Sequence, residues 1–185
     1  RWIDPRGARR VGLAHVPEDR HARALVMRFA AWESAILGYE GLDASSTRAG
    51  WMRGTRVRAA TRALMQRFDV RPPDPTLASA NFSGGNQQKL VLAREIGQAP
   101  GILLVGQPTR GVDIGAIEFI HGQLRRLRDA GGAVLLVSSE LDEILALADR
   151  VLVMNEGRIT GELAIAECTE ERVGLLMCAS VRASA

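Results

Sequence analysis

Residues 82 to 90 carry the pattern best suited to chemistry, a serine and two glycines directly before a run with helical spacing, Phe-Ser-Gly-Gly-Asn-Gln-Gln-Lys-Leu. Ser83 is a good helix N-cap, and Gly84 and Gly85 let a ligand approach the backbone of the first turn. The free amides and aligned peptide dipoles at such an end favour an anion. The pattern predicts a phosphate-binding helix start, with an ordinary loop and cap as an equally weighted alternative when it is taken alone.

The segments that must position this helix alternate between apolar runs and runs with helical spacing. The helix is predicted to continue to Ile96, and the apolar runs at 102–105 and 133–137 are typical of buried strands in a parallel sheet. Further helices are predicted at about 110–130 and after Ser138. The alternation of strand and helix predicts an α/β fold.

The C-terminal part has a different pattern. Apolar runs at 150–154 and 158–162, separated by Asn155, Glu156 and Gly157, predict a β-hairpin. A last helix is predicted at about 169–177. The chain contains no internal repeat and no pattern of a second domain.

Residues 25 to 100 have mainly helical patterns. A helix is predicted from near Arg48 to a stop before Pro72, with apolar positions at Ala59, Ala63, Leu64 and Phe68. Four aromatic residues in this section predict a local cluster, most simply a core: Phe29, Trp32, Tyr39 and Trp51.

Composition limits the class of protein. With 185 residues, 46% hydrophobic, 24% charged and no apolar run near 18 residues, the chain predicts one soluble domain without a membrane span. The net charge of +3 invites a nucleic-acid interpretation, but the arginines are spread among 21 acidic residues and only 4% of residues are aromatic. The densest basic group is predicted to be a solvated helix face: Arg53, Arg56, Arg58 and Arg62.

Two residue types carry little chemistry here. Cys168 and Cys178 lack metal spacing and are expected to be free thiols in a reducing cytosol. The three histidines are expected to be structural or surface residues: His15, His21 and His121.

No basic-then-apolar leader opens the chain, so nothing indicates secretion, and the start at Arg1 is interpreted as a cut.

The order of these features resembles the second half of an ATP-binding cassette (ABC) ATPase domain. The order is a serine-glycine-glycine helix, a strand, a proline loop, an aspartate turn, a helix, a strand, a polar turn and a helix. In that family FSGGNQQ is the signature motif, LLVGQP holds the Walker B position, GVD is the D-loop and Ser139 stands at the switch-histidine position. The sequence FSGGNQQKLVLAREI, followed by QPTRGVDIGAIEFIH, is similar to sequences of the ATPase subunits of bacterial simple-sugar and nucleoside importers.

The resemblance implies the C-terminal part of an ABC-type P-loop NTPase domain, with a parallel-sheet core and an inserted helical subdomain. The helical and signature subdomain would span about 25–100, and the remaining α/β core would span 1–24 and 101–185. A P-loop needs GxxxxGK followed by Ser or Thr. The chain's single lysine, Lys89, follows Gln88, so no P-loop is present and the N-terminal part of the domain is inferred to be missing.

In the importers that the chain resembles, two ATPase domains are fused and pack head to tail, and the resemblance places this fragment in the C-terminal part of the second domain. By this resemblance Ser83, Gly84, Gly85, Asn86 and Gln87 would contact ATP in trans, on the P-loop of the partner domain, and Asp113 in the D-loop would reach across the same interface. Glu18 stands at the Q-loop position, which touches metal and the membrane subunits. The alternative for Glu18 is an ordinary surface carboxylate.

The chain's own site departs from the family pattern. Gly106 and Gln107 stand where a working site carries an aspartate that holds Mg²⁺ and a glutamate that polarises water, and Ser139 lacks the switch imidazole. Glycine offers no carboxylate oxygen, and a neutral amide cannot take a proton from water. This half is therefore expected to be degenerate, with no intact catalytic residue and no metal ligand. ATP and Mg²⁺ would be bound mainly by the partner domain and the missing P-loop.

The resemblance implies an ATP-hydrolysing subunit that powers uptake of a small sugar or nucleoside, the fragment alone being inactive. Its partners would be the second ATPase domain, transmembrane permease subunits and indirectly a solute-binding protein, with no nucleic acid. It would be cytoplasmic and peripheral at the inner face of the plasma membrane. In this setting the aromatic section could instead form a groove for a coupling helix of the permease. The alternative function is a non-transport ABC protein in DNA repair or on the ribosome, or an inactive ABC scaffold.

Overall fold

The computed structural model describes residues 4–40 and 52–178. The chain divides into two compact units, Arg1–Val137 and Ser138–Ala185, and each is described by itself.

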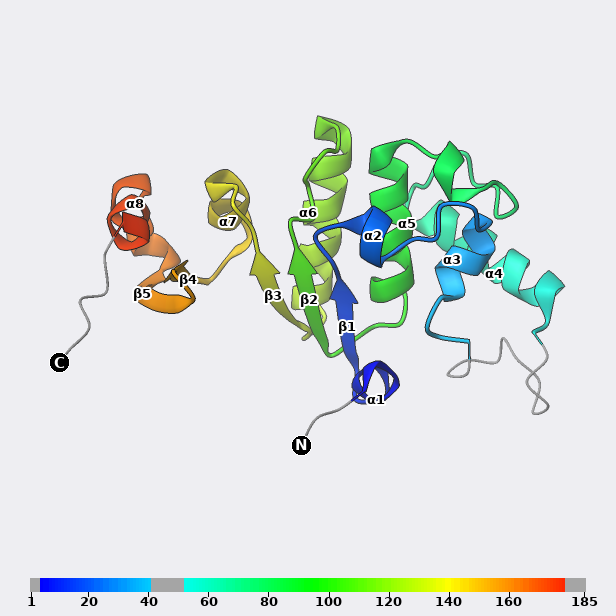
Figure 1. The fold of residues 1–185 in the computed structure, drawn as a ribbon, viewed down its shortest axis with the longest axis horizontal. Helices are drawn as coiled ribbons and strands as arrows, with labels where there is room; N and C mark the ends of the chain where they lie inside the picture. The colour runs from blue at the N-terminus through cyan, green and yellow to red at the C-terminus, as the bar shows by residue number, and fades with distance from the viewer. Residues whose placement is uncertain (1–3, 41–51, 179–185) are drawn as a thin grey trace. The chain divides into compact units, whose positions relative to one another are not determined.

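The first unit is built on a three-stranded parallel sheet. Its strands lie in the order β1 (Leu13–Val16), β2 (Ile102–Gly106) and β3 (Ala133–Val137), as Figure 1 shows. Val16 is opposite Val105, which is opposite Leu136. The predicted α/β fold with a parallel sheet is confirmed, and both predicted strands lie where the apolar runs placed them.

Helices cover one face of this sheet. Helix α5 (Gly84–Ile96) contacts β1, and α6 (Ile114–Asp129) contacts β3 and α5. The strand residues on the covered face include four that are buried: Ala14, Val16, Leu103 and Val105. On the other face Ile102, Leu135 and Val137 remain 48%, 55% and 61% exposed. The sequence predicted fully buried strands, but among the described residues of the first unit taken by itself, helices cover only one face of the sheet.

The remaining helices of the first unit are short, apart from α4. They are α1 (Pro5–Arg10), α2 (Arg20–Arg23), α3 (Ala31–Ile36), α4 (Gly54–Arg67) and the 3-10 turn η1 (Ser79–Asn81). Residues 48 to 51 of the helix predicted from Arg48 lie outside the described part, and the described helix begins at Gly54.

The buried stripe of α4 differs from the prediction. Val57, Thr61 and Met65 are buried, whereas Ala59 and Ala63 are exposed. The stripe follows steps of four residues from Val57, and the larger side chains occupy it, so the alanines face solvent. The predicted solvated arginine face is confirmed, since all four of its members are exposed: Arg53, Arg56, Arg58 and Arg62.

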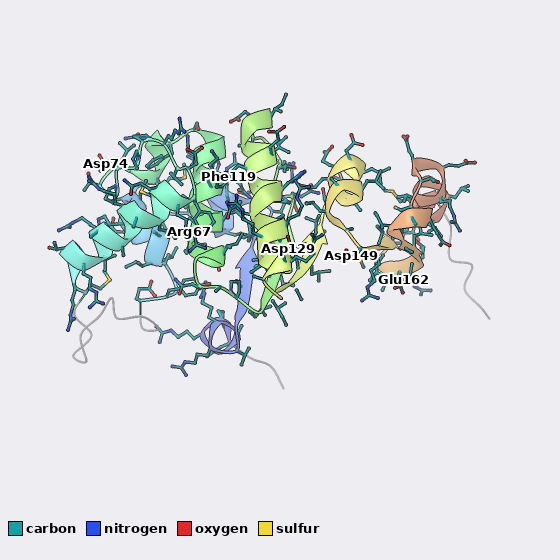
Figure 2. All side chains as sticks on the ribbon, turned by 180° about the vertical axis from the view of Figure 1, so that it is seen from behind. Arg67, Asp74, Phe119, Asp129, Asp149 and Glu162 are labelled. Carbon is teal, nitrogen blue, oxygen red and sulfur yellow. The ribbon has the colours of Figure 1, made fainter. Side chains whose placement is uncertain are left out.

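Packing between α4 and α6 involves aromatic rings. Phe68, directly after α4, and Phe119 of α6 meet edge to face at 6.4 Å between ring centroids. The Arg67 guanidinium lies 5.4 Å from the Phe68 ring centre; Arg67 and Phe119 are labelled in Figure 2. Of the predicted aromatic cluster, Tyr39 is buried, Phe29 and Trp32 are half-buried, and Trp51 lies outside the described residues.

The second unit contains a hairpin and two flanking helices. Its elements are α7 (Leu141–Leu147), β4 (Arg150–Asn155), β5 (Arg158–Ala164), the 3-10 turn η2 (Ile165–Glu167) and α8 (Glu170–Cys178). The predicted hairpin is confirmed: the strands are antiparallel, and Glu156 and Gly157 turn the chain with φ of 48° and 75°. Its small core is formed by Val151, Val153, Leu163, Cys168 and Val173. Both cysteines are free, as expected.

A buried polar network joins α5 to the end of α2, to α3 and to Tyr39 after α3. Arg94 donates to the Glu95 carboxylate at 2.7 Å and to the carbonyl oxygens of Ala24 and Ser34. The Tyr39 hydroxyl donates to the other Glu95 oxygen at 2.6 Å, and the Arg9 guanidinium lies 4.7 Å from the Tyr39 ring centre. Burial, followed by the Glu95 charge, raises the pKa of Tyr39.

Replacing Tyr39 with phenylalanine is expected to lower the free energy of unfolding by about 1–3 kcal/mol, because a Glu95 oxygen loses its donor in a site where Glu95 is 1% exposed. The raised pKa stabilises the fold below about pH 10, and this contribution is lost as pH rises through the folded-state value. Chemical unfolding at pH 7 and in steps above pH 9 measures both effects. Equal stability of the two proteins at pH 7 would contradict the expected role of this hydroxyl.

Candidate functional site

The N-terminus of α5 has the geometry that the sequence predicted. Ser83 is extended, with φ −60° and ψ 158°, and its hydroxyl oxygen accepts bonds from the Asn86 backbone amide at 3.4 Å and the Asn86 side chain at 2.9 Å. Ser83 is therefore the N-cap, and the first turn contains Gly84 and Gly85. Such an end is suited to an anion.

The two glycines are also needed within the chain. A Cβ at Gly84 would lie 2.8 Å from Nη2 of Arg20 and 3.1 Å from the carbonyl oxygen of Gly111. A Cβ at Gly85 would lie 2.9 Å from Oδ2 of Asp113. Both glycines thus let the 110–113 loop and Arg20 approach the helix closely, in addition to leaving room for a ligand.

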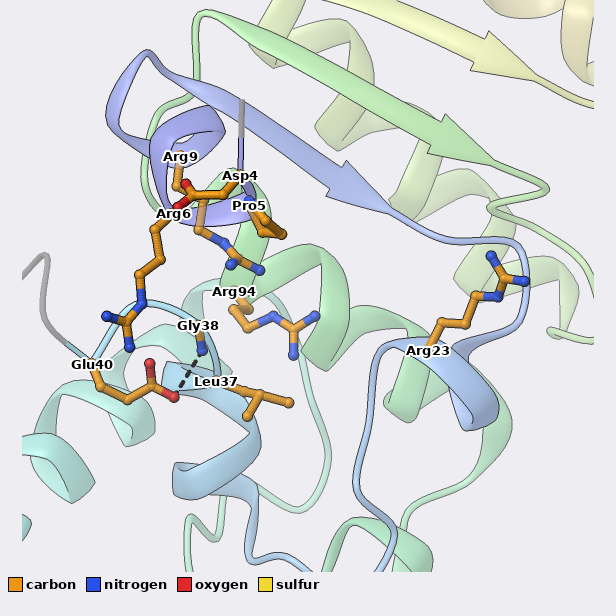
Figure 3. Close-up of a pocket in the computed structure, with 9 residues that line it drawn as sticks. All are labelled: Asp4, Pro5, Arg6, Arg9, Arg23, Leu37, Gly38, Glu40 and Arg94. Atoms are coloured by element: carbon orange, nitrogen blue, oxygen red, sulfur yellow. Dashed lines mark hydrogen bonds between the residues drawn. The ribbon is translucent and has the colours of Figure 1, made fainter. Parts of the chain in front are cut away.

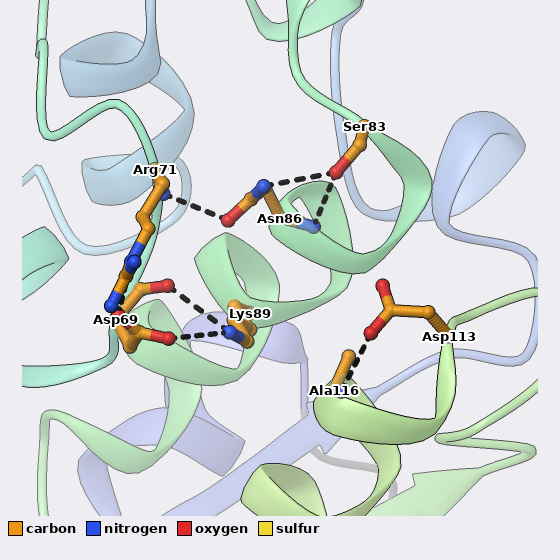
Figure 4. A network of polar contacts seen from close by, with 7 residues as sticks. All are labelled: Asp69, Arg71, Ser83, Asn86, Lys89, Asp113 and Ala116. Carbon is orange, nitrogen blue, oxygen red and sulfur yellow. Dashed lines mark hydrogen bonds and ion pairs between the residues drawn. The ribbon is translucent and has the colours of Figure 1, made fainter.

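The side chains of Asn86 and Gln87 bond inside the protein. Oδ1 of Asn86 accepts the backbone amide of Arg71 at 2.8 Å, and Figure 4 shows Asn86 between Arg71 and Ser83. Gln87 is only 4% exposed and donates from Nε2 to the carbonyl oxygen of Ser79 at 3.1 Å. Both amides were expected to extend a donor surface toward ATP. Both side chains bond to neighbouring segments of the chain, and their expected donation toward ATP stays a prediction.

The only lysine of the chain holds the loop after α4. Nζ of Lys89 lies 2.9 Å from Oδ2 of Asp69 and 3.2 Å from the Asp69 carbonyl oxygen, as seen in Figure 4. Asp69 has φ 51°, and Arg71 pairs with its other oxygen. Hydrogen bonds from Lys89 and then Arg71 lower the pKa of Asp69. These contacts fix the 69–71 loop against α5, next to Asn86.

Asp113 has a local role at the start of α6. Its Oδ1 accepts the amide of Ala116 at 2.9 Å, which makes Asp113 the N-cap of that helix (Figure 4). The side chain is exposed, and Ile114 beside it is 78% exposed. The structure thus brings Asp113 to the N-terminus of α5. Its expected reach across an interface stays a prediction.

Gly106 and Gln107 lie at the carboxyl end of β2, against the segment that follows β1. A Cβ at Gly106 would lie 3.3 Å from the backbone nitrogen of Glu18 and 3.5 Å from its Cβ. The Glu18 carboxylate pairs with Arg110. Gln107 has φ 46°, and its amide donates to the Val137 carbonyl oxygen at 2.8 Å. Position 106 is therefore next to Glu18.

Ser139 belongs to the second unit, between β3 and α7. Its place in one site with Gly106 and Gln107 stays a prediction. Among residues 4–40 and 52–178 no group of three or more His, Cys, Asp or Glu side chains could hold a metal ion.

A basic pocket on the first unit was not predicted. It has a volume of about 550 Å³, and Figure 3 shows its lining side chains. Four arginines and two acids line it, with Pro5, Leu37 and Gly38: Arg6, Arg9, Arg23, Arg94, Asp4 and Glu40. The arginines come from three separate helices, α1, α2 and α5, so no local sequence pattern could identify them.

Sequence reasoning also gave no functional role to Arg20 and His21. Nη1 of Arg20 donates to the Arg110 carbonyl oxygen at 3.1 Å, and Nε2 of His21 lies 2.8 Å from Oε1 of Gln87. Their sequence setting, a short polar turn after a strand, gives no sign of these contacts, which join residues far apart in the chain.

Comparisons with known proteins find relatives along nearly the whole chain. No family model matches the chain. The guanosine import ATP-binding protein NupO of Bacillus subtilis (strain 168) is 43% identical over 183 residues, which are 99% of this chain and 36% of that protein. The nucleoside import ATP-binding protein NupA of Lactococcus lactis subsp. cremoris (strain MG1363) is 41% identical over 94% of this chain and 34% of its own length.

A ribose import ATP-binding protein, RbsA of Oceanobacillus iheyensis, is 35% identical over 92% of this chain and 34% of its own length. The chain thus spans about a third of the length of these relatives. Among solved structures, a dimeric ATP-binding cassette in a post-hydrolysis state with ADP and Pi superposes with a TM-score of 0.70. That match is 22% identical and covers 85% of this chain and 64% of the other.

The fold and these relatives place the chain among the ATP-binding cassette ATPases, of which it forms part of one domain. Within that class its relatives are the ATP-binding proteins of nucleoside and ribose import. The resemblance to this family is thereby confirmed. In the described part of the chain, no helix is both long and apolar enough to cross a membrane.

Proposed function

We propose that the chain is part of the ATP-binding subunit of an ABC importer, which hydrolyses ATP to power uptake of a small sugar or nucleoside. The observation that carries this proposal is the N-terminus of α5, where a capped first turn with Gly84 and Gly85 lies beside the Asp113 loop. The names of the relatives, which concern guanosine, nucleoside and ribose import, support the substrate class.

The signature loop acts in trans in this proposal. Backbone amides of Gly84 and Gly85, with the Ser83 end of the helix, face the terminal phosphate of an ATP held by the P-loop of a second ATPase domain. Support comes from the side chains: Gln87 is buried and Asn86 is bonded to Ser83 and Arg71, so the backbone amides and the exposed Ser83 hydroxyl are the best-placed donors. Asp113 contributes from the adjoining loop, and Mg²⁺ is held by the partner site.

The chain's own half-site does not catalyse hydrolysis in this proposal. Gly106 supplies no carboxylate for Mg²⁺ and Gln107 no base, and Ser139 supplies no imidazole. The close approach of Glu18 to Gly106 supports this assignment, because the space that an aspartate would need is narrowed by the Glu18 backbone. The residues present at this end of β2 therefore do not fit a magnesium ion.

The partners follow from the same proposal. They are a second ATPase domain in the same polypeptide, permease subunits that hold the protein at the inner face of the membrane, and indirectly a solute-binding protein. A permease segment docks near Glu18 and the aromatic section.

Reconstitution tests the proposal. The full-length subunit, assembled with its permeases in vesicles, is expected to take up labelled nucleoside or ribose only when ATP is supplied. A variant of the partner P-loop that cannot bind ATP provides the control. ATP hydrolysis without uptake of any sugar or nucleoside, or activity that needs DNA or ribosomes, would favour the non-transport alternative.

A further inference from the structure

The segment directly after β1, residues 18–21, contacts the N-terminus of α5 and Arg110 in the loop beside it. Arg20 donates to the Arg110 carbonyl oxygen at 3.1 Å, and its guanidinium lies beside Gly84, where an added Cβ would come within 2.8 Å of Nη2. Glu18 pairs with the Arg110 guanidinium. One residue further on, His21 reaches Gln87 at 2.8 Å. The segment 18–21 therefore contacts both α5 and Arg110, which directly precedes the D-loop residues 111–113.

The direction of the His21 to Gln87 bond follows from the neighbouring bond. Nε2 of Gln87 donates to the Ser79 carbonyl oxygen at 3.1 Å, which places Oε1 toward His21. Because a side-chain carbonyl oxygen only accepts, Nε2 of His21 must carry a hydrogen and donate. The bond thus requires a donor at position 21.

Both ends of this bond are held in place. Gln87 is 4% exposed and Ser79 is fully buried, so the Gln87 amide has one orientation. The carboxylate of Asp19 accepts the backbone amides of His21 at 2.9 Å and Ala22 at 3.0 Å, which fixes the start of α2. These amide bonds lower the pKa of Asp19. The hydrogen bond between His21 and Gln87 therefore joins two held ends, the start of α2 and the first turn of α5.

We propose that His21 is a positioning residue, whose hydrogen bond to Gln87 couples the segment 18–21 to the N-terminus of α5 and so orients the backbone amides of Gly84 and Gly85. The inference rests on the proposed function, in which those amides contact the ATP of the partner domain. His21 touches no nucleotide itself. Loss of the His21 side chain misplaces the Gly84 and Gly85 backbone amides during ATP hydrolysis, while the P-loop of the partner domain continues to bind ATP.

The test uses the full-length subunit assembled with its permeases in vesicles, after the wild-type complex has been shown to import substrate and hydrolyse ATP. His21→Phe keeps a ring but removes the donor, and His21→Gln keeps a donor of similar reach. His15→Phe is the matched control, because His15 is exposed on β1, away from α5. Gln87→Met and the double variant with His21→Phe measure the coupling between the two positions.

We expect His21→Phe to lower kcat for ATP about fivefold to tenfold, with KM for ATP within twofold of wild type. His21→Gln should keep at least half of the wild-type kcat, His15→Phe should match wild type, and the double variant should be no slower than Gln87→Met. A thermal unfolding midpoint of His21→Phe close to wild type separates this role from a loss of folding.

Three results would overturn the inference while leaving the proposed function intact: wild-type kcat in His21→Phe, no rescue by His21→Gln, or independent multiplication of the two single effects in the double variant. If Gln87→Met does not fold, the His21 variants alone decide between these outcomes. A wild-type complex without ATP-dependent uptake would instead contradict the proposed function.

Discussion

Replacing Gly84 with alanine in the assembled transporter is expected to reduce ATP hydrolysis and import by on the order of a hundredfold. The added methyl group would lie 2.8 Å from Nη2 of Arg20 and 3.1 Å from the Gly111 carbonyl oxygen, so the Arg20 guanidinium must move aside and the Gly111 loop must give by a few tenths of an ångström. The methyl group would also stand where the terminal phosphate of ATP approaches the backbone. Steady-state hydrolysis, uptake and equilibrium ATP binding measure the effect. Binding should persist, because the partner P-loop holds the nucleotide.

Gly122→Ala is the matched control for this variant. Gly122 also lies in a helix, α6, and a Cβ there would meet nothing within 4 Å. It should retain wild-type activity, since alanine also favours the helix by up to about 1 kcal/mol. Substantial transport by Gly84→Ala would contradict the assignment of residues 83 to 87 as the signature loop.

A double variant separates the two causes of the Gly84 effect. Arg20→Ala removes the nearer of the two neighbours of the added methyl group, while the methyl group itself remains. If approach of phosphate is what the methyl group blocks, Gly84→Ala with Arg20→Ala should stay inactive. Recovery of activity would show that crowding within the chain, and not a contact to the partner's nucleotide, caused the loss.

Restoring a glutamate at position 107 alone is expected to leave the hydrolysis rate of the assembled transporter almost unchanged. Gln107→Glu supplies a base, but Gly106 still offers no ligand to Mg²⁺ and Ser139 no imidazole. The three changes Gly106→Asp, Gln107→Glu and Ser139→His should be needed together for any gain. Their effects should be far from additive, because such groups act as one unit.

The structure adds an obstacle to the Gly106→Asp step. A Cβ at this position would lie 3.3 Å from the Glu18 backbone nitrogen, so the segment after β1 must shift by a few tenths of an ångström to admit it. Steady-state ATP hydrolysis for each single, double and triple variant measures the outcome. A clear gain from Gln107→Glu alone would show that metal is held without an aspartate and would contradict the role given to Gly106.

Local sequence signals were sufficient for the elements that carry the site. Ser83 before two glycines predicted the N-cap of α5, because capping depends on residues within one turn. The apolar runs predicted β2 and β3, and the Asn-Glu-Gly turn predicted the β4–β5 hairpin, because strand and turn propensities are also local. The motifs that follow the signature supplied the family.

The contacts of the site residues could not be predicted in this way. No sequence signal indicated that the Gln87 amide bonds to Ser79 and His21, which approach from other segments. Likewise, the buried stripe of α4 runs from Val57 to Met65 and leaves out the predicted alanines, because packing against other helices decides which face is buried. Such choices depend on tertiary neighbours, and the sequence pattern of one helix does not contain them.

The central claim is that this chain serves the partner's ATP site with its signature loop and that its own half-site is not used for hydrolysis. Steady-state ATP hydrolysis by assembled transporters that carry Gly84→Ala or Gln107→Ala, measured side by side with wild type, tests it most directly. We predict that Gly84→Ala is almost inactive and that Gln107→Ala hydrolyses ATP at close to the wild-type rate. The reverse result, an active Gly84→Ala and an inactive Gln107→Ala, would contradict the claim.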